Sequence, residues 1–322
     1  MLSTEAAGEH VRRHYGIAGA VERVAKGRAS NYCISGGGGR WLLKVFQPEY
    51  TKARLEQAAA FVSFVARSGY PAREFVSARD GASVLTIEDR AAILIPWIDG
   101  DTPEPNTLSS PEMLAQVGAL CGRMHRLGDA YPHAHMLGYA GSTRSLAEKR
   151  AALLRLAKQE TNLEIADEAR CRADILESLG EEVERSQARA RQGIIHGDFS
   201  GAHVVFQDDR AVGVIDVLGE RYLPGWELMR AFFQSVPSSS VDTIEAPWRA
   251  YVSGYASEHP ITPDEIAIAY DTYLLQLTSS TYGLRAPLDD QLRAFGRWRM
   301  ALAQQLARNR TGLRAMMTLS AS

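Results

Sequence analysis

The residue pattern of this chain changes near residue 99, and this change limits the folds that it can adopt. Before it, short runs rich in Val, Ile, Tyr and Trp alternate with glycine-bearing turns, which is typical of β-strands. Beyond it, apolar residues recur mostly at helical spacing. The polar segment 99–106, which holds two prolines, predicts the connection. We therefore expect an α+β fold with a β-rich first part, residues 1–98, and a mainly helical second part, residues 99–322.

The pattern also predicts individual elements. A helix is expected over residues 52–67, because Leu55, Ala58 and Val62 recur at helical spacing and Gly69 follows. A second helix is expected to begin at Ser110 and Pro111, and one or two more lie within residues 145–191. Helical spacing returns from residue 226 onward. The expected strands are residues 21–25, 32–35, 40–46, 83–87 and 91–98, and a later group at 193–195, 204–206 and 212–215.

Charge and cysteine content exclude several functions. Lys and Arg number 36 against 38 Asp and Glu, so no broad basic field is available for nucleic acid or an anionic membrane. The three cysteines are widely scattered, which indicates neither a disulfide framework nor a zinc site. No stretch approaches the roughly 18 apolar residues of a membrane helix, and the first residues lack a signal-peptide pattern. We expect a cytoplasmic protein without a nucleic-acid or membrane partner.

Two aspartates stand at the ends of apolar runs in the later strand group. Asp198 follows Ile194-Ile195-His196-Gly197, and Asp216 follows Val212-Gly213-Val214-Ile215. Phosphoryl transfer needs such a pair, because one carboxylate orients the attacking hydroxyl and accepts its proton while the other holds Mg²⁺. His203 lies between them, five residues after Asp198. In contrast, Asp208-Asp209 lies in a polar stretch that predicts a hairpin turn.

The motif His196-Gly197-Asp198, followed by His203 and by Val214-Ile215-Asp216, resembles the aminoglycoside phosphotransferase and choline kinase superfamily. That resemblance implies a bilobal protein-kinase-like fold, with a nucleotide-binding N-lobe (1–98) and a larger C-lobe (99–322) that holds the catalytic loop, the metal site and a helical acceptor-binding region. It extends to the residues that the family uses around the nucleotide. These are Gly27, Ser30 and Asn31 in the phosphate-covering loop, Lys44 on its strand, Glu56 on the next helix, and Pro96, Trp97 and Ile98 in the hinge that meets the adenine.

The resemblance also implies roles. Lys44 would bind the α- and β-phosphates of ATP or GTP and pair with Glu56, Asp198 would be the catalytic base, and Asp216 would bind Mg²⁺. His203 stands where most members of the family have a metal-binding Asn. The macrolide phosphotransferases resemble this chain in carrying His at that position. Because Mg²⁺ prefers hard oxygen ligands, His203 either binds the metal or orients one of the aspartates. Glu227, where the family usually has Asp, would support the catalytic loop.

The expected activity is transfer of the γ-phosphate to a hydroxyl of a small molecule. Residues 251–255 and 260–265 resemble type II homoserine kinases, whereas His203 is similar to the macrolide kinases. The acceptor is therefore an amino alcohol or an antibiotic, and an antibiotic acceptor would imply a role in resistance. Two alternatives remain: a Ser/Thr protein kinase of the bacterial stress-response type, and a catalytically weak nucleotide-binding regulatory protein.

Other residues have two readings each. The glycines at 36–39 predict a hairpin turn better than a phosphate cradle, and His125 is expected to be a hydrogen-bonded core residue rather than a ligand. A group of C-terminal arginines either meets an anionic substrate or forms a solvated basic helix face. This group is Arg285, Arg293, Arg297 and Arg299.

Overall fold

The computed structural model describes residues 2–25, 29–141, 144–237, 243–282, 284 and 290–319. The chain forms two compact units that interleave in sequence. The first unit combines Met1–Pro103, Arg123–Ala140 and Ile194–Arg221, and the second combines Glu104–Gly122, Gly141–Gly193 and Tyr222–Ser322. The first unit thus joins the β-rich start of the chain to the segment that carries Asp198 and Asp216. The assignment of separate lobes to residues 1–98 and 99–322 stays a prediction.

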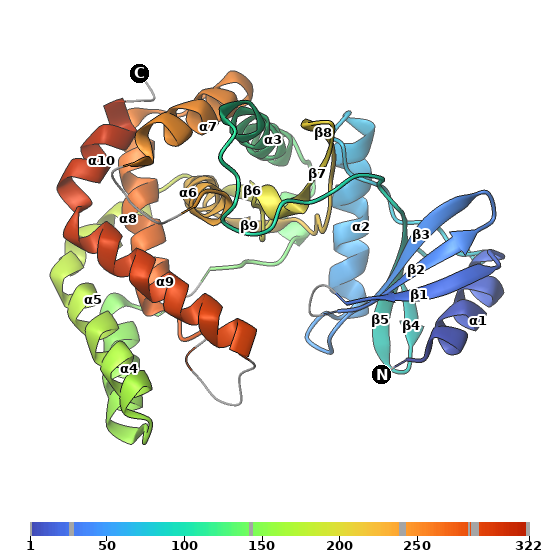
Figure 1. Cartoon of the computed structure of the whole chain (residues 1–322), viewed down its shortest axis with the longest axis horizontal. Helices are drawn as coiled ribbons and strands as arrows, with labels where there is room; N and C mark the ends of the chain where they lie inside the picture. The colour runs from blue at the N-terminus through green and yellow to red at the C-terminus, as the bar shows by residue number, and fades with distance from the viewer. Residues whose placement is uncertain are drawn as a thin grey trace. The chain divides into compact units, whose positions relative to one another are not determined.

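The first unit is built on a five-stranded antiparallel sheet of order β1-β2-β3-β5-β4 (Figure 1). Each expected strand of the first part is present. Their bounds are β1 Gly19–Val24, β2 Ser30–Gly36, β3 Gly39–Val45, β4 Leu85–Ile87 and β5 Arg90–Pro96. Because β3 is hydrogen-bonded on both sides, its side chains are held in a fixed register.

Each face of this sheet carries its own core and its own helix. Helix α1 (Thr4–Tyr15) buries Ala7 and Val11 against Leu43 and Val45 of β3. Helix α2 (Lys52–Arg67) packs Leu55 with Ile93 of β5 on the other face. The period of two along a strand therefore turns the residue between Leu43 and Val45, which is Lys44, toward the α2 side. The bounds of α2 agree with the sequence-based prediction, whereas α1 was not predicted.

Two expected hairpin turns are confirmed. Gly37 and Gly38, between β2 and β3, have φ of 62° and 80°, which glycine adopts without steric cost. Asp208 and Asp209 have φ of 47° and 60° and connect β7 (Val204–Gln207) to β8 (Arg210–Val214). The remaining strands form a two-stranded ladder of β6 (Gly193–Ile195) with β9 (Glu220–Tyr222). Short 3₁₀ helices cover Ala134–Met136 (η1) and Gly201–His203 (η2).

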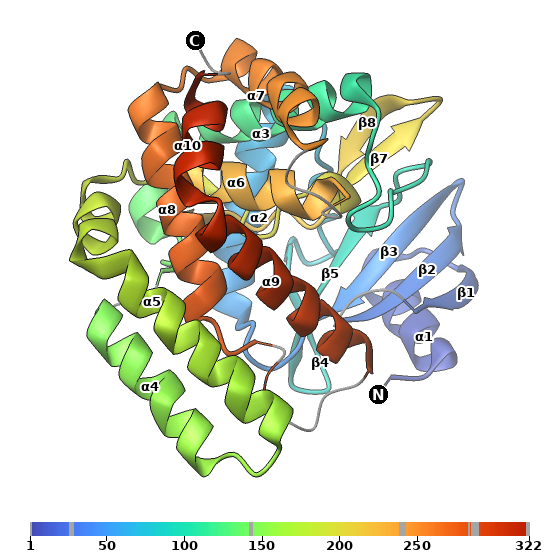
Figure 2. The same cartoon turned by 60° about the vertical axis from the view of Figure 1, so that its left-hand side comes forward.

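The second unit is mainly helical, and α8 packs against α5, α6, α9 and α10 (Figure 2). The first part of α3 crosses α7 closely, since a Cβ at Gly118 would lie 1.9 Å from the carbonyl oxygen of Tyr251. The helices are α3 Pro111–Asp129, α4 Leu146–Gln159, α5 Leu163–Arg189, α6 Pro224–Ser235, α7 Glu245–Glu258, α8 Pro263–Ser279, α9 Asp290–Arg308 and α10 Arg310–Leu319. They confirm the helices expected at Pro111 and within residues 145–191.

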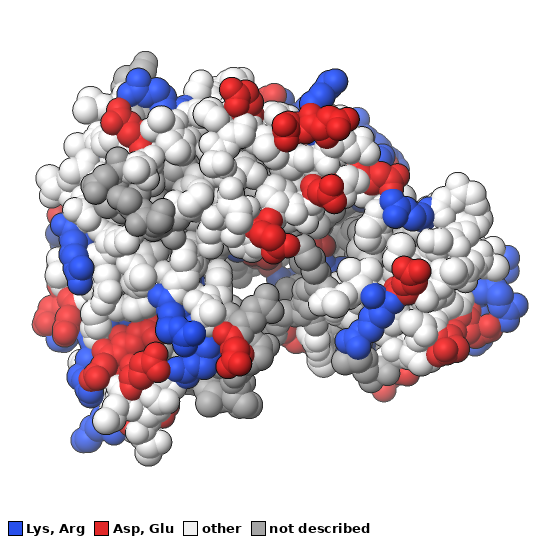
Figure 3. Space-filling model, in the orientation of Figure 1, with Lys and Arg blue, Asp and Glu red and all other residues white. Residues whose placement is uncertain are grey.

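The surface agrees with the nearly balanced charge of the sequence. On the face drawn in Figure 3, Lys and Arg side chains are interspersed with Asp and Glu and do not merge into one basic patch. Within the described ranges, none of the helices combines the length and the hydropathy that crossing a membrane requires.

Candidate active site

Lys44 and Asp216 form the central ion pair of the first unit. The Nζ atom of Lys44 lies 2.6 Å from Oδ1 of Asp216, and the two side chains are 13% and 35% exposed. Lys44 is held between Asn31 of β2 and Ile93 of β5 by the strand register. Its ammonium group also lies 5.3 Å from the centre of the Phe46 ring. A strand that is hydrogen-bonded on both sides thus presents one cation to the segment that follows β8.

The carboxylate of Asp216 is kept ionised by its surroundings. Burial alone would raise its pKa, but the charge and hydrogen bond of Lys44, with smaller contributions from His203 and His196, lower that pKa below its usual value. Asp216 also has φ of 61°, a conformation that non-glycine residues adopt rarely. Backbone strain of this kind is commonly found where a side chain must be aimed at a ligand.

His196 connects the two aspartate segments. Its Nε2 atom donates to the carbonyl oxygen of Ile215 at 2.9 Å, and its Nδ1 atom accepts from the backbone N–H of Asp198 at 3.2 Å. A carbonyl oxygen only accepts and a backbone N–H only donates, so Nε2 is the donor of this ring and Nδ1 is its acceptor. With His196 only 1% exposed, this ring fixes the backbone at Asp198 relative to the residue before Asp216. The sequence motif contained His196 but did not reveal this positioning role.

His203 lies beside Asp198. Its Nε2 atom is 3.5 Å from Oδ2 of Asp198, and its Nδ1 atom is 3.2 Å from the hydroxyl of Ser200. The backbone carbonyl of His203 accepts from Ile215 at 3.0 Å, which fixes this segment against β8. The Asp198 side chain is 62% exposed, so its carboxylate is accessible to a hydroxyl from outside.

The ion pair expected between Lys44 and Glu56 does not occur in the part of the chain that the structure describes. Glu56 follows the buried Leu55 on α2 and therefore lies on the outer face, where it is 54% exposed and 3.9 Å from Lys52. Helix α2 contacts the catalytic segment through another pair, Arg54 with Glu220 of β9. Glu220 in turn lies over Gly197, where a Cβ would be 2.9 Å from the carboxylate. Sequence reasoning missed this pair because β9 has no apolar pattern.

The other predicted nucleotide residues are placed as follows. Ser30 and Asn31 are buried on β2, and Ser30 accepts a hydrogen bond from Arg90 at 3.1 Å. Pro96 ends β5, and the backbone N–H of Trp97 donates to the carbonyl of Arg40. Ile98 contacts Gly213 of β8, where a Cβ would be 2.7 Å from its side chain. Gly27 lies outside the described residues.

Several other candidates lie in the helical part of the chain. Glu227 is fully buried on α6, and its charge helps to raise the pKa of the Cys121 thiol, which burial raises most. His125 is fully buried on α3, as expected of a core residue. Of the C-terminal arginines, Arg293 pairs with Glu164 at 3.2 Å, whereas Arg297 is exposed and Arg285 lies outside the described residues. Arg299 is buried.

The arrangement brings together an exposed carboxylate, an ionised carboxylate and a lysine on one scaffold. The family comparison agrees with this set, since the model of the phosphotransferase enzyme family matches residues 20–217, which include Lys44, Asp198 and Asp216. The chain belongs to this family. The resemblance that the His196-Gly197-Asp198 motif indicated is thereby confirmed.

Two curated relatives are similar in sequence to parts of this chain. A homoserine kinase of Hyphomonas neptunium is 31% identical over 111 residues, which are 34% of this chain and 33% of that protein. That match spans only a third of the relative. A homoserine kinase of Zymomonas mobilis is 22% identical over 241 residues, which are 74% of this chain and 71% of that protein.

The fold itself is shared with solved kinases. Spectinomycin phosphotransferase, solved with ADP and spectinomycin, gives a TM-score of 0.72 at 11% identity and covers 99% of this chain and 98% of its own. A microcompartment-associated aminopropanol kinase gives 0.67 at 15% identity, with 96% and 98% covered. These likenesses confirm the expected protein-kinase-like fold, with its β-rich sheet and mainly helical remainder.

Proposed function

We propose that the protein transfers the γ-phosphate of ATP, with Mg²⁺, to a hydroxyl of a small amino alcohol such as homoserine. The observation that carries this proposal is the convergence of Lys44, Asp198 and Asp216 in the first unit, within the range that the family model matches. Positioning and charge neutralisation account for most of the catalysis in phosphoryl transfer, and these residues supply both.

The chemistry of the residues fits a nucleotide with a hard divalent cation. Asp216 offers a carboxylate that stays ionised, as a magnesium ligand must. When bound, Mg²⁺ neutralises charge on the phosphate oxygens. Both ring nitrogens of His203 already lie close to Ser200 and Asp198, so we assign it the orientation of Asp198 rather than ligation.

Three residues of the chain have separate roles in the proposed transfer. Lys44 attracts the phosphate oxygens from its fixed place on β3, and Asp216 directs its carboxylate from a left-handed backbone conformation. Asp198, oriented by His203 and by the His196 hydrogen bond, accepts the proton of the acceptor hydroxyl as that oxygen attacks.

The acceptor is proposed from the relatives. The two homoserine kinases match by sequence, and the segments at 251–255 and 260–265 point to the same branch. An antibiotic acceptor is the second candidate, favoured by the likeness in fold to spectinomycin phosphotransferase. We place it second because that likeness rests on 11% identity.

The test is a calorimetric titration of ATP and GTP, with Mg²⁺ and then with EDTA, followed by phosphorylation assays on homoserine, aminoglycosides and macrolides. Wild type should bind nucleotide more tightly with Mg²⁺, and Asp216→Ala should lose that difference. Asp198→Asn should keep binding but lose about 10²- to 10⁴-fold in kcat. Asp208→Asn, in the exposed hairpin turn of the same segment, is the matched control. Full turnover by Asp198→Asn would refute the assignment of the base.

A further inference from the structure

The two predicted nucleotide residues at the start of β2 face opposite sides of the sheet. Ser30 pairs with Val45 of β3, and Val45 belongs to the core that α1 covers. Asn31 pairs with Lys44, which faces the α2 side. Residues that pair directly across two strands project from the same face, so Ser30 projects toward α1 and Asn31 lies beside Lys44. Of the two, only Asn31 is on the face that carries the ion pair of Lys44 with Asp216.

An arginine on the α1 side of the sheet holds Ser30. The Nη2 atom of Arg90 donates a hydrogen bond to the Ser30 hydroxyl at 3.1 Å. Arg90 is the first residue of β5 and pairs with Ile87 of β4, which belongs to the same core as α1, so Arg90 projects from the same face as Ser30. In the sheet order, β3 lies between β2 and β5. The contact therefore ties the start of β2 to the start of β5 across an intervening strand.

A tight turn fixes the place from which Arg90 reaches Ser30. Strand β4 ends at Ile87 and β5 begins at Arg90, so only Glu88 and Asp89 connect them. Both connecting residues have positive φ, of 46° and 60°, as two-residue hairpin turns require. A turn of this length sets the register of the two strands it joins. The guanidinium of Arg90 therefore starts from a defined position at the end of the sheet.

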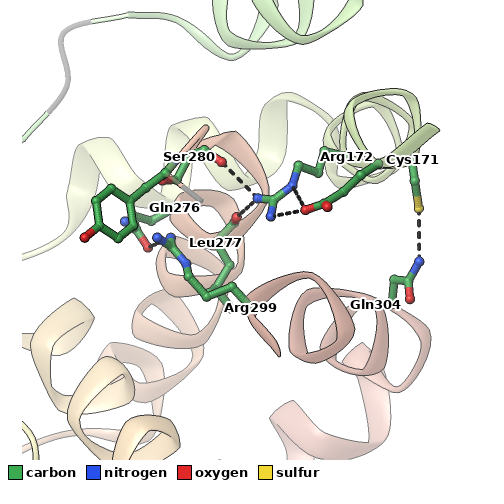
Figure 4. Close-up of polar contacts among 9 residues, drawn as sticks. Cys171, Arg172, Gln276, Leu277, Ser280, Arg299 and Gln304 are labelled. Carbon is green, nitrogen blue, oxygen red and sulfur yellow. Dashed lines mark hydrogen bonds and ion pairs between the residues drawn. The ribbon is translucent and has the colours of Figure 1, made fainter. Parts of the chain in front are cut away.

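An arginine that supports the fold itself has different partners in this chain. Arg172 of α5 is fully buried and lies 2.7 Å from Oε1 of Glu168. It also donates to the carbonyl oxygens of Leu277 and Ser280, at 2.6 and 2.9 Å (Figure 4). Arg90 is only half-buried, and it forms no ion pair within the described part of the chain. Its hydrogen bond goes to the side chain of one residue, at the start of the strand that carries the predicted nucleotide contact.

We propose that Arg90 is a positioning residue of the nucleotide site. Through Ser30 it holds the first residue of β2, and it thereby keeps the next residue, Asn31, beside Lys44 for contact with the phosphates. Ser30 acts through this contact and does not bind the nucleotide itself. The inference rests on the proposed function and deepens it, because it adds to the site a residue on the face of the sheet opposite to Lys44.

A double-mutant cycle on the binding of ATP with Mg²⁺, measured by calorimetry, tests the proposal. Arg90→Met and Ser30→Ala should each raise the Kd about three- to tenfold, the range expected for loss of one hydrogen bond to a charged group. The double variant should show no further rise, because both changes remove the same contact. Asn31→Ala should also raise the Kd. Arg23→Met, which removes an exposed arginine of β1, is the control and should stay within about twofold. Additive effects of the two changes, or a wild-type Kd in Arg90→Met, would overturn the proposal.

Two further comparisons separate positioning from other roles of Arg90. Ser30→Ala keeps the charge of Arg90, so a wild-type Kd in this variant would mean that Arg90 attracts the phosphates by its charge alone, which would overturn the inference. Arg90→Lys keeps an N–H donor and should recover most of the affinity.

Kinetics and thermal unfolding complete the test. In Arg90→Met the KM for ATP should rise with the Kd while kcat stays within about twofold, because Asp198 and Asp216 are unchanged. A lower unfolding temperature with an unchanged Kd would identify Arg90 as purely structural and overturn the inference. If wild type binds no ATP with Mg²⁺, the proposed function itself fails. If wild type binds it and all the variants bind it equally well, only the role of Arg90 fails.

Discussion

At the scale of single residues, the ion pair of Lys44 with Asp216 governs the ionisation of the proposed metal ligand. The folded-state pKa of Asp216 lies below its usual 3.8. Its charge therefore stabilises the fold above that pH, and this stabilisation is lost as the pH falls through the folded-state pKa. Without Lys44, burial would act on Asp216 with less compensation, and its pKa would rise.

We accordingly expect Lys44→Met to lose stability at a higher pH than wild type does. The measurement is the urea midpoint between pH 3 and pH 6, in EDTA, for both proteins. Lys52→Met is the matched control, because Lys52 forms only an exposed pair with Glu56 at 3.9 Å and such pairs contribute little. If the urea midpoints of wild type and Lys44→Met fall over the same pH range, the electrostatic role of Lys44 is contradicted.

The residues of the site differ in how far the sequence could predict them. Asp198, Asp216 and Lys44 were visible because a charged residue stood at the end of, or inside, an apolar run. Glu56, which was expected to pair with Lys44 but lies beside Lys52, shows the limit of such reasoning. One helical turn offers several charged positions, and only the packing of Leu55 decides that Glu56 points outward. The hydrogen bond of His196 to Ile215 spans 19 residues of chain, and no local pattern encodes it.

At the scale of elements, α2 is joined to the catalytic segment by Arg54 and Glu220. We expect Glu220→Gln to lower kcat on the order of tenfold, since loss of this charge-assisted contact, worth about 1.5–3 kcal/mol, loosens the backbone at Gly197. Glu56→Gln, on the exposed face of the same helix, should change kcat less than twofold, within the small effect of an exposed pair. Steady-state kinetics with saturating ATP compare the two variants. A larger loss of kcat in Glu56→Gln than in Glu220→Gln would contradict this expectation. It would instead support the Lys44–Glu56 pairing that the family resemblance implied.

The elements also differ in how readily their sequences predict them. The bounds of α2 were predicted from apolar residues at helical spacing, among them Leu55, Ala58 and Val62, which are buried, whereas α1 buries only Ala7 and Val11. The sequence signals for α1 lay at the two ends of the helix. Ser3 caps its first turn, and Gly16, with φ of 74°, ends its last turn. Strand β9 has three residues and pairs with β6, and so short a strand shows no apolar pattern of its own.

At the scale of the whole molecule, the candidate active site belongs to one of the two compact units. Lys44, Asp198 and Asp216 all lie in the first unit. A ligand that binds only the folded state stabilises it by about 2.7 kcal/mol at 100 times its Kd, and amide protons of the unit that binds it exchange more slowly. A bound nucleotide should therefore slow exchange most in the segments that carry these three residues.

Hydrogen exchange read by mass spectrometry can test this expectation. ATP with Mg²⁺ should slow exchange in β2, β3 and residues 194–217, and Asp216→Ala should remove that protection because it lacks the proposed metal ligand. Asp208→Asn, in the exposed hairpin turn of the same segment, is the matched control and should keep the protection. Equal protection of these segments in Asp216→Ala and in wild type would contradict the proposed role of Asp216 in metal binding.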